Sequence, residues 1–169
     1  MNILEIAKKR FSTRSYLDKE ISQETLDIIL DAAHVAPTAA NLQPVRLLVV
    51  KSDEAKAKLS KAANIYHAPI AIIVCADTSK SWKRPFDGMK TTDIDASIIT
   101  DHMMLTATEQ GLGSVWICYF KPDVVKSEFN LPENLEPINI LALGYTNEKA
   151  NPARHSSQRI PKEELISFI

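Results

Sequence analysis

The chain has 169 residues, of which 45% are hydrophobic and 24% are charged, and its formal net charge is -1. This length is typical of one domain with its own hydrophobic core, so we expect a single domain over residues 1–169. The nearly neutral charge argues against broad electrostatic binding to nucleic acid or to an anionic membrane. No apolar run approaches the ~18 residues of a membrane span, and the early charges of MNILEIAKKR are untypical of a signal peptide, so we expect a soluble cytoplasmic protein.

The first half of the chain alternates helical and extended patterns. Ser22 is a good N-cap, and Leu26, Ile29 and Ala33 recur after it at the spacing of one helix face. Short continuous apolar runs are instead typical of strands that are buried on both faces. These patterns predict helices over 2–10, 22–36 and 53–63 and buried strands over 45–51 and 68–77.

One long apolar helix, predicted over 93–113, dominates the second half. Apolar residues occur nearly all round it, so we expect a second chain to cover part of its surface. Asp93 and Asp95 suit its N-terminus, which explains the acidic stretch TTDIDAS better than a metal site does. The order of elements predicts an α+β fold around one sheet. The remaining patterns predict a surface loop over 79–92, strands over 114–120 and 137–145, a short helix over 121–130 and a tail over 146–169.

The cysteines and histidines do not form a metal-binding or disulfide pattern. Cys75 and Cys118 lie inside apolar runs and belong to no CxxC pair, so we expect two buried, reduced thiols. The four histidines lack the spacing of metal ligands. They are His34, His67, His102 and His155. We therefore expect no metal.

The segment RFSTRSY begins at Arg10 and places two of the chain's six arginines four residues apart. In an extended segment alternate residues face the same way, so Arg10, Ser12 and Arg14 would share one face, and Phe11 and Thr13 the other. Guanidinium groups offer paired donors to oxyanions, and a hydroxyl adds a further donor, which suits a phosphate cradle. Two solvated surface arginines are the simpler interpretation of this motif by itself.

The loop APTAANLQP follows the second helix. Thr38, Asn41 and Gln43 supply donors and acceptors, and their neighbours are small. Asn and Gln amides can pair with the edge of a heterocycle that carries both C=O and N–H groups, and small neighbours let a flat ring approach the backbone. A polar turn between a helix and a strand is the alternative.

Four segments occur in one order along the chain: KKRFSTRSY, AAHVAPTAANLQPVRLLVV, ATEQGLGSVWI and LPENLEPINILALGY, the last before a basic tail. The GLG follows a helix and enters a strand, the reverse of a dinucleotide fingerprint. Over nearly the whole chain these segments resemble the FMN-dependent nitroreductase family, in particular its short, single-domain members. The resemblance implies a three-layer α+β fold, with a central mixed or antiparallel sheet flanked by helices. It also implies a homodimer that holds two FMN molecules at its interface.

The resemblance further implies which residues hold the cofactor. The arginine-serine motif would bind the FMN phosphate, and a basic residue of the tail would complete that cradle. Arg159 is the best match in the tail, and Arg154 and His155 are weaker candidates. Carried over residue by residue, the cofactor-binding positions are Arg10, Ser12, Arg14, Pro37, Thr38, Ala39, Asn41, Gln43, Ile117, Cys118 and Arg159.

Two of these positions depart from the family pattern. Some members carry consecutive serines after the proline of the loop, whereas Ala39 follows Thr38 here, so only the backbone of Ala39 is expected to contact the flavin. Longer members can carry an acidic residue where Cys118 stands. A backbone N–H at Cys118 would then serve the flavin ring, and the thiol is not expected to be catalytic.

The resemblance implies an enzyme that passes hydride from NADH or NADPH, through FMN, to a nitroaromatic or a quinone by a ping-pong scheme. No side chain would act as a nucleophile, because the cofactor carries the chemistry. The substrate-pocket positions are Trp82, Arg84, Phe86 and Tyr119. A solvated surface loop is the alternative for the segment around Trp82. Three alternatives remain: the same fold with dehalogenation or flavin fragmentation, a non-catalytic flavin sensor or carrier, and a phosphate-binding or adaptor protein without flavin.

Overall fold

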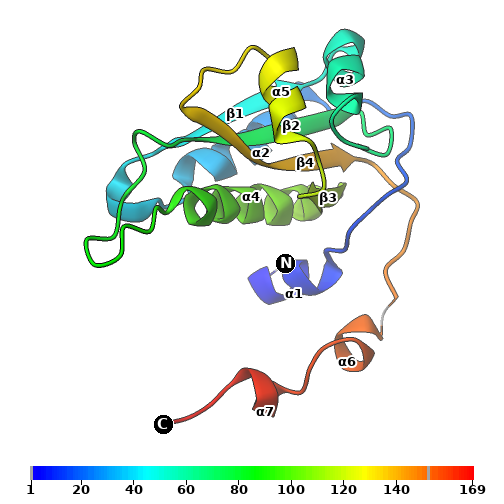
Figure 1. The fold of residues 1–169 in the computed structure, drawn as a ribbon. Helices are drawn as coiled ribbons and strands as arrows, with labels where there is room; N and C mark the ends of the chain where they lie inside the picture. Colours follow the sequence, from blue (N-terminus) through cyan, green and yellow to red (C-terminus); the bar gives the residue numbers. More distant parts are fainter. Residues whose placement is uncertain (1, 152) are drawn as a thin grey trace.

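A four-stranded antiparallel sheet forms the middle layer of the computed structural model, which describes residues 2–151 and 153–169 (Figure 1). The strand order is β1-β2-β4-β3, so β2 and β4 are central. In the register, Ile72 of β2 lies opposite Val49 of β1 on one side and Leu141 of β4 on the other. The strands are β1 (Val45–Val50), β2 (Ile70–Asp77), β3 (Gly113–Ile117) and β4 (Leu135–Gly144).

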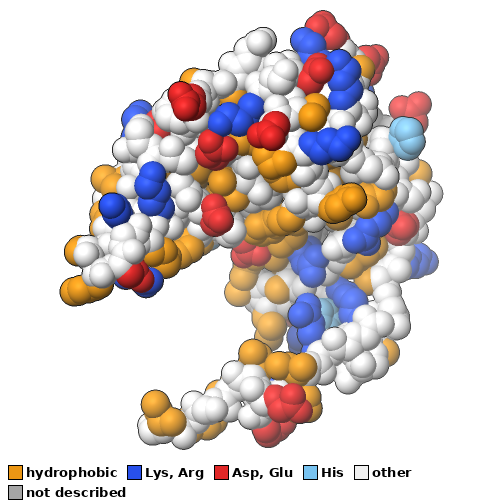
Figure 2. Space-filling model, in the orientation of Figure 1, with side chains coloured by type: hydrophobic (Ala, Val, Ile, Leu, Met, Phe, Trp, Pro, Cys, Tyr) orange, Lys and Arg blue, Asp and Glu red, His pale blue; other side chains and the backbone are white. Residues whose placement is uncertain are grey.

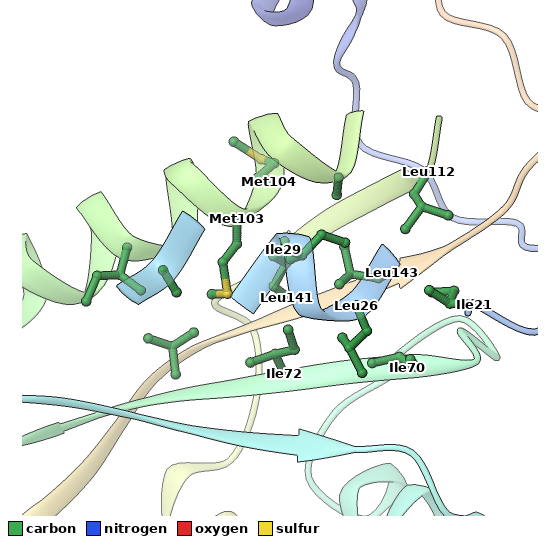
Figure 3. Packing of buried hydrophobic residues seen from close by; sticks show 14 of the residues in the cluster. Ile21, Leu26, Ile29, Ile70, Ile72, Met103, Met104, Leu112, Leu141 and Leu143 are labelled. Atoms are coloured by element: carbon green, nitrogen blue, oxygen red, sulfur yellow. The ribbon is translucent and has the colours of Figure 1, made fainter. Parts of the chain in front are cut away.

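Helices cover both faces of this sheet, so the predicted three-layer α+β fold is confirmed. One face packs against α2 (Gln23–Val35) and α4 (Thr92–Glu109). Figure 3 shows this core, in which side chains of both helices meet side chains of β2 and β4. The other face packs against α3 (Asp53–Ser60) and α5 (Pro122–Glu128).

The helix boundaries follow from local capping. The hydroxyl of Ser22 accepts a hydrogen bond from the backbone N–H of Thr25 at the start of α2, and Ser52 caps α3 in the same way. Asn2 and Glu5 form a reciprocal capping box at α1 (Ile3–Lys9). Beyond α4, Gly111 takes a left-handed φ of 80°, which a glycine adopts without a steric penalty.

Two of the strand predictions need correction. The strand after the APTAANLQP loop was expected to be buried, but β1 is an edge strand and exposes Arg46 and Val49. β3 ends at Ile117, before Cys118, whose side chain is exposed. The prediction of two buried thiols is therefore right for Cys75, whose pKa burial raises to about 12, and wrong for Cys118.

The tail leaves the body of the protein after β4 and forms a separate arm (Figures 1 and 2). It contains α6 (Arg154–Ser157) and α7 (Lys162–Leu165). Phe168 is 96% exposed and Leu165 is 70% exposed, so the arm carries apolar side chains that this chain alone does not cover. Over the residues that the structure describes, no helix is long and apolar enough to span a bilayer.

Candidate functional site

The RFSTRSY segment lies in an extended conformation beside the start of β3. The backbone N–H of Thr13 donates to the carbonyl of Ser114 (2.9 Å), and Ser12 forms a parallel bridge with Ser114. Thr13 is fully buried, whereas Ser12 and Arg14 are exposed. The predicted alternation of faces is therefore confirmed here, and the polar face of the segment points to solvent.

Two glycines allow this segment to approach the sheet closely. A Cβ added to Gly113 would lie 2.6 Å from Oγ1 of Thr13, and one added to Gly144 would lie 2.6 Å from Cδ1 of Tyr16. The Tyr16 hydroxyl can donate to the carbonyl of Thr13 (3.0 Å), and burial raises its pKa, so it remains a donor at any physiological pH. The backbone of the segment is thus fixed from the side opposite to the arginines.

Arginine side chains converge at the beginning of the same segment. Burial is the largest cause that lowers the pKa of Arg10, and the positive charges of Arg154 and Arg159 lower it further. The negative charge of Asp101 has a smaller effect and raises the pKa of Arg10. Figure 2 shows Lys and Arg side chains gathered where the tail arm meets the body. A half-buried guanidinium among like charges fits an oxyanion ligand such as a phosphate.

The structure distinguishes the three basic candidates of the tail. Arg154 donates from Nη2 to the carbonyls of Lys8 and Arg10, the latter at 2.9 Å, and Nε2 of His155 lies 3.1 Å from the carbonyl of Lys8. Both side chains therefore satisfy carbonyls at the C-terminal end of α1. Arg159 forms no hydrogen bond or ion pair with residues 2–151 or 153–169, so of the three candidates it is the one whose donors remain available to a ligand.

The APTAANLQP loop is compact and strained, with a 3-10 turn over Ala39–Asn41. Ala40, Asn41 and Gln43 all have φ values near +50°, in the left-handed region. The hydroxyl of Thr38 accepts from the backbone N–H of Gln43 (3.1 Å). The N–H of Ala39 donates to Oδ1 of Asp95 (2.8 Å), so the expected backbone contact of Ala39 with a flavin cannot use that donor in this conformation.

The expected surface loop around Trp82 is an ordered hairpin, which we call the 82–91 hairpin. Its strands are joined by hydrogen bonds from the N–H of Arg84 to the carbonyl of Met89 and from the N–H of Thr91 to the carbonyl of Trp82. The Nε and Nη2 atoms of Arg84 donate to the two carboxylate oxygens of Asp87 (2.8 and 2.5 Å), so these donors are used within the hairpin. Phe86 stands at the tip and is 94% exposed.

Asp77 fixes the turn that follows β2. Its Oδ1 accepts from the backbone N–H and hydroxyl of Ser79 and from Nδ2 of Asn134 (2.8 Å). The hydrogen bonds of Ser79 and Asn134 lower the pKa of Asp77 from its ordinary 3.8 to about 2.

The Asp77 carboxylate should therefore make fold stability sensitive to acid. A carboxylate with a depressed pKa contributes stability that is complete above its unfolded pKa and is lost as the pH falls through its folded pKa. We expect the difference in unfolding free energy between the wild type and Asp77→Asn to shrink between about pH 5 and about pH 2. Urea unfolding at several pH values measures it, with the exposed Asp93→Asn as the control. An Asp77→Asn difference that stays constant over this range would contradict the assignment.

The predicted site residues fall into two groups at opposite ends of α4 (Figure 1). Thr13 and the arginine motif contact Ser114, just after the C-terminal end of α4, whereas Ala39 contacts Asp95 in its first turn. At ~1.5 Å per residue, the helix between Asp95 and Glu109 is about 21 Å long. One chain thus brings Arg159 near Arg10 and leaves Ser12 and Arg14 exposed on the same segment, but it does not bring these residues to the APTAANLQP loop.

Other predicted positions lie around the end of β3. Ile117 is buried in the sheet opposite Ile140, and Cys118 and Tyr119 follow it with exposed side chains, Tyr119 at 96%. The sequence reasoning missed Tyr66, whose ring lies 5.8 Å from the guanidinium carbon of Arg14. Tyr66 has a left-handed φ of 56°, and no spacing or composition signal indicates such a conformation at a tyrosine.

Comparisons with known proteins identify the family of this chain. A family model described as the nitroreductase family matches residues 7–65 and 56–145, which together make up most of the chain. The chain belongs to the nitroreductase family. A crystal structure of a nitroreductase family protein from Clostridium difficile 630 is 56% identical, with a TM-score of 0.97 over 99% of this chain and 98% of that one.

Curated relatives of this nitroreductase-family chain carry oxidoreductase names. A protein of Methanothermobacter thermautotrophicus, named for NADH dehydrogenase and NAD(P)H nitroreductase, is 35% identical over 88% of this chain and 79% of its own length. An FMN reductase (NAD(P)H) of Bacillus subtilis is 30% identical over 94% of this chain and 74% of its own length. The family that the four sequence segments indicated is therefore confirmed.

Proposed function

We propose that the protein binds FMN and transfers hydride from NADH or NADPH to an electron-poor acceptor, a nitroaromatic or a quinone, by a ping-pong mechanism. NAD(P)H is oxidised in the first half-reaction, and the acceptor takes up the hydride and a proton from solvent in the second. When bound, FMN supplies the centre that accepts and then donates the two electrons. The arginine cluster beside RFSTRSY, in a chain of the nitroreductase family, is the observation that carries this proposal.

The chain's own residues would bind and orient the cofactor. Arg10, Arg14 and Arg159 supply planar paired donors for a phosphate, and the exposed hydroxyl of Ser12 adds one more. The cradle is rigid because Thr13 is bonded to Ser114 behind it. We place the flavin ring toward the end of β3, where Cys118 offers backbone groups.

We propose that the active form is a homodimer. The APTAANLQP loop and the arginine motif lie at opposite ends of α4, so a site that uses both takes them from two chains. The exposed apolar residues of the tail arm, among them Leu165 and Phe168, are explained if they pack on the partner subunit. Pro37, Thr38, Ala39, Asn41 and Gln43 would then face the flavin that the partner subunit holds.

The acceptor would enter beside the 82–91 hairpin. Trp82, Phe86 and Tyr119 offer flat apolar surfaces that suit an aromatic substrate. Arg84 was predicted to line the pocket. We now assign it the role of stabilising the hairpin through its pair with Asp87, rather than that of a donor to the substrate. The exposed Lys83 is the neighbouring cation that remains for a nitro group.

A visible spectrum of the purified protein tests this function. We expect a bound-flavin band that bleaches on anaerobic addition of NADH or NADPH and returns on addition of a nitroaromatic or a quinone. Light scattering on the same sample should give twice the chain mass of 18.8 kDa. A colourless protein that takes up no added FMN would contradict the cofactor, and a strict monomer with full FMN occupancy would contradict the shared site. A flavin band that neither nicotinamide bleaches would contradict the electron donor.

A further inference from the structure

Asp95 is a buried carboxylate whose two oxygens bond to the APTAANLQP loop and to Thr91, the N-cap residue at the start of α4. It is 1% exposed, although it stands in the first turn of α4. Oδ1 accepts from the backbone N–H of Ala39 (2.8 Å), and Oδ2 accepts from the hydroxyl of Thr91 (2.9 Å). In the part of the chain that the structure describes, no lysine, arginine or histidine forms an ion pair with it.

A buried carboxylate without a cation is unfavourable for folding unless its hydrogen bonds compensate for the lost hydration. A helix N-terminus does not explain it, because neither oxygen of Asp95 accepts from a free N–H group of α4. Asp93, two residues earlier, is exposed and is the ordinary acidic residue of this helix end. The two partners of Asp95 therefore indicate its role.

The first partner holds the strained part of the APTAANLQP loop. Ala39 is followed directly by Ala40 and Asn41, with φ values of 49° and 53°. Left-handed conformations at residues other than glycine persist only where the surroundings hold them. The bond from Ala39 to Asp95 joins this turn to α4, whereas the bonds of Thr38 stay within the loop.

The second partner closes the base of the 82–91 hairpin. Thr91 donates its backbone N–H to the carbonyl of Trp82 (3.1 Å) while its hydroxyl donates to Asp95. One carboxylate thus bonds both to the loop proposed to face the flavin of the partner subunit and to the hairpin proposed to line the acceptor pocket. Both elements project at the same end of α4 (Figure 1).

We propose that Asp95 is a positioning residue, which fixes the APTAANLQP loop and the 82–91 hairpin in one geometry so that the two walls of the site are preformed. This inference rests on the proposed function, since it assumes that the loop meets a flavin. Asp95 does not touch the cofactor itself. It acts through Ala39 and Thr91, and preformed walls favour binding because less conformational entropy is lost when the ligand arrives.

The test compares full-length Asp95→Ala and Asp95→Asn with the wild type and with the control Asp93→Ala. FMN affinity is measured by fluorescence titration, and hydrogen exchange is measured at residues 39–43 and 82–91 in the flavin-free protein. We expect Asp95→Ala to weaken FMN binding at least about tenfold and to speed exchange in both segments. Asp95→Asn should keep most of the FMN affinity and most of the slow exchange of the wild type. Its Oδ1 can accept from the N–H of Ala39, and its Nδ2 can donate to the hydroxyl oxygen of Thr91.

The results distinguish a positioning role of Asp95 from a role in fold stability alone. If Asp95→Ala lowers the melting temperature but leaves FMN affinity and the exchange rates as in Asp93→Ala, Asp95 is only structural and the inference is wrong. If Asp95→Ala does not fold, Asp95→Asn and Thr91→Val carry the test, and Thr91→Val should speed exchange in the hairpin alone. A wild type that takes up no FMN overturns the proposed function and the role of Asp95 with it. A wild type that binds FMN no better than Asp95→Ala overturns this inference alone.

Discussion

Arg10→Ala is expected to weaken FMN binding about 10- to 100-fold, since a charge-assisted hydrogen bond to an ionised partner contributes about 1.5–3 kcal/mol. The flavin-free protein should keep or slightly raise its melting temperature. The like charges of Arg154 and Arg159 repel the Arg10 guanidinium, which also loses hydration by burial, so its removal relieves an unfavourable interaction. Titration of the apoprotein with FMN and thermal unfolding of the apoprotein measure the two effects.

The combination of weaker binding and unchanged apoprotein stability is specific to a ligand-binding arginine. Lys8→Ala is the matched control. Lys8 is exposed and stands two residues before Arg10, and its substitution by alanine removes the same unit of charge. It should weaken FMN binding much less, and only through long-range charge that salt screens. If the apoprotein of Arg10→Ala unfolds at a much lower temperature while its FMN affinity is unchanged, Arg10 is structural and the phosphate cradle is misassigned.

Much of the fold could be predicted from the sequence because its signals are local. Ser22 capping α2, the apolar stripe of that helix, and the continuous apolar run of β2 each depend on residues close together in the chain. The edge position of β1 could not be predicted in this way. Its run VRLLVV is as apolar as that of a central strand, and only the pairing of distant segments decides which strand has a free edge.

The site was predictable to the extent that its residues lie in short motifs. Arg10, Ser12 and Arg14 share one short segment, and alternation alone predicts that they face the same way. The structure confirms this for Ser12 and Arg14, whereas Arg10 is the half-buried C-cap of α1. Arg154 and Asp95 show the limit of such reasoning. A basic residue in the tail and an acidic residue at a helix start both suit standard roles, but their actual partners are the carbonyls of α1 and the N–H of Ala39.

Gly113→Ala is expected to lower both stability and FMN affinity, through a single steric cause. The new Cβ would lie 2.6 Å from Oγ1 of Thr13 and 2.8 Å from Cγ2 of Thr146. Neither neighbour can retreat easily, because Thr13 is bonded to Ser114 and the hydroxyl of Thr146 donates to the carbonyl of Ser15 (2.8 Å). Overpacking of this kind costs about 1–3 kcal/mol, or roughly 2–12 °C in melting temperature for a chain of this size.

The same steric clash should reach the ligand, because any shift that is forced on Thr13 also moves its neighbours Ser12 and Arg14. Gly111→Ala separates this effect from general loss of stability. Gly111 has a left-handed φ of 80° but no atom within 4 Å of an added Cβ, so an alanine there costs about 1 kcal/mol of backbone strain without touching the segment. Both variants should melt earlier than the wild type, and only Gly113→Ala should show an FMN dissociation constant raised several-fold in titration. Equal FMN affinity in the two variants would mean that the approach of Thr13 to β3 does not set the geometry of the arginines.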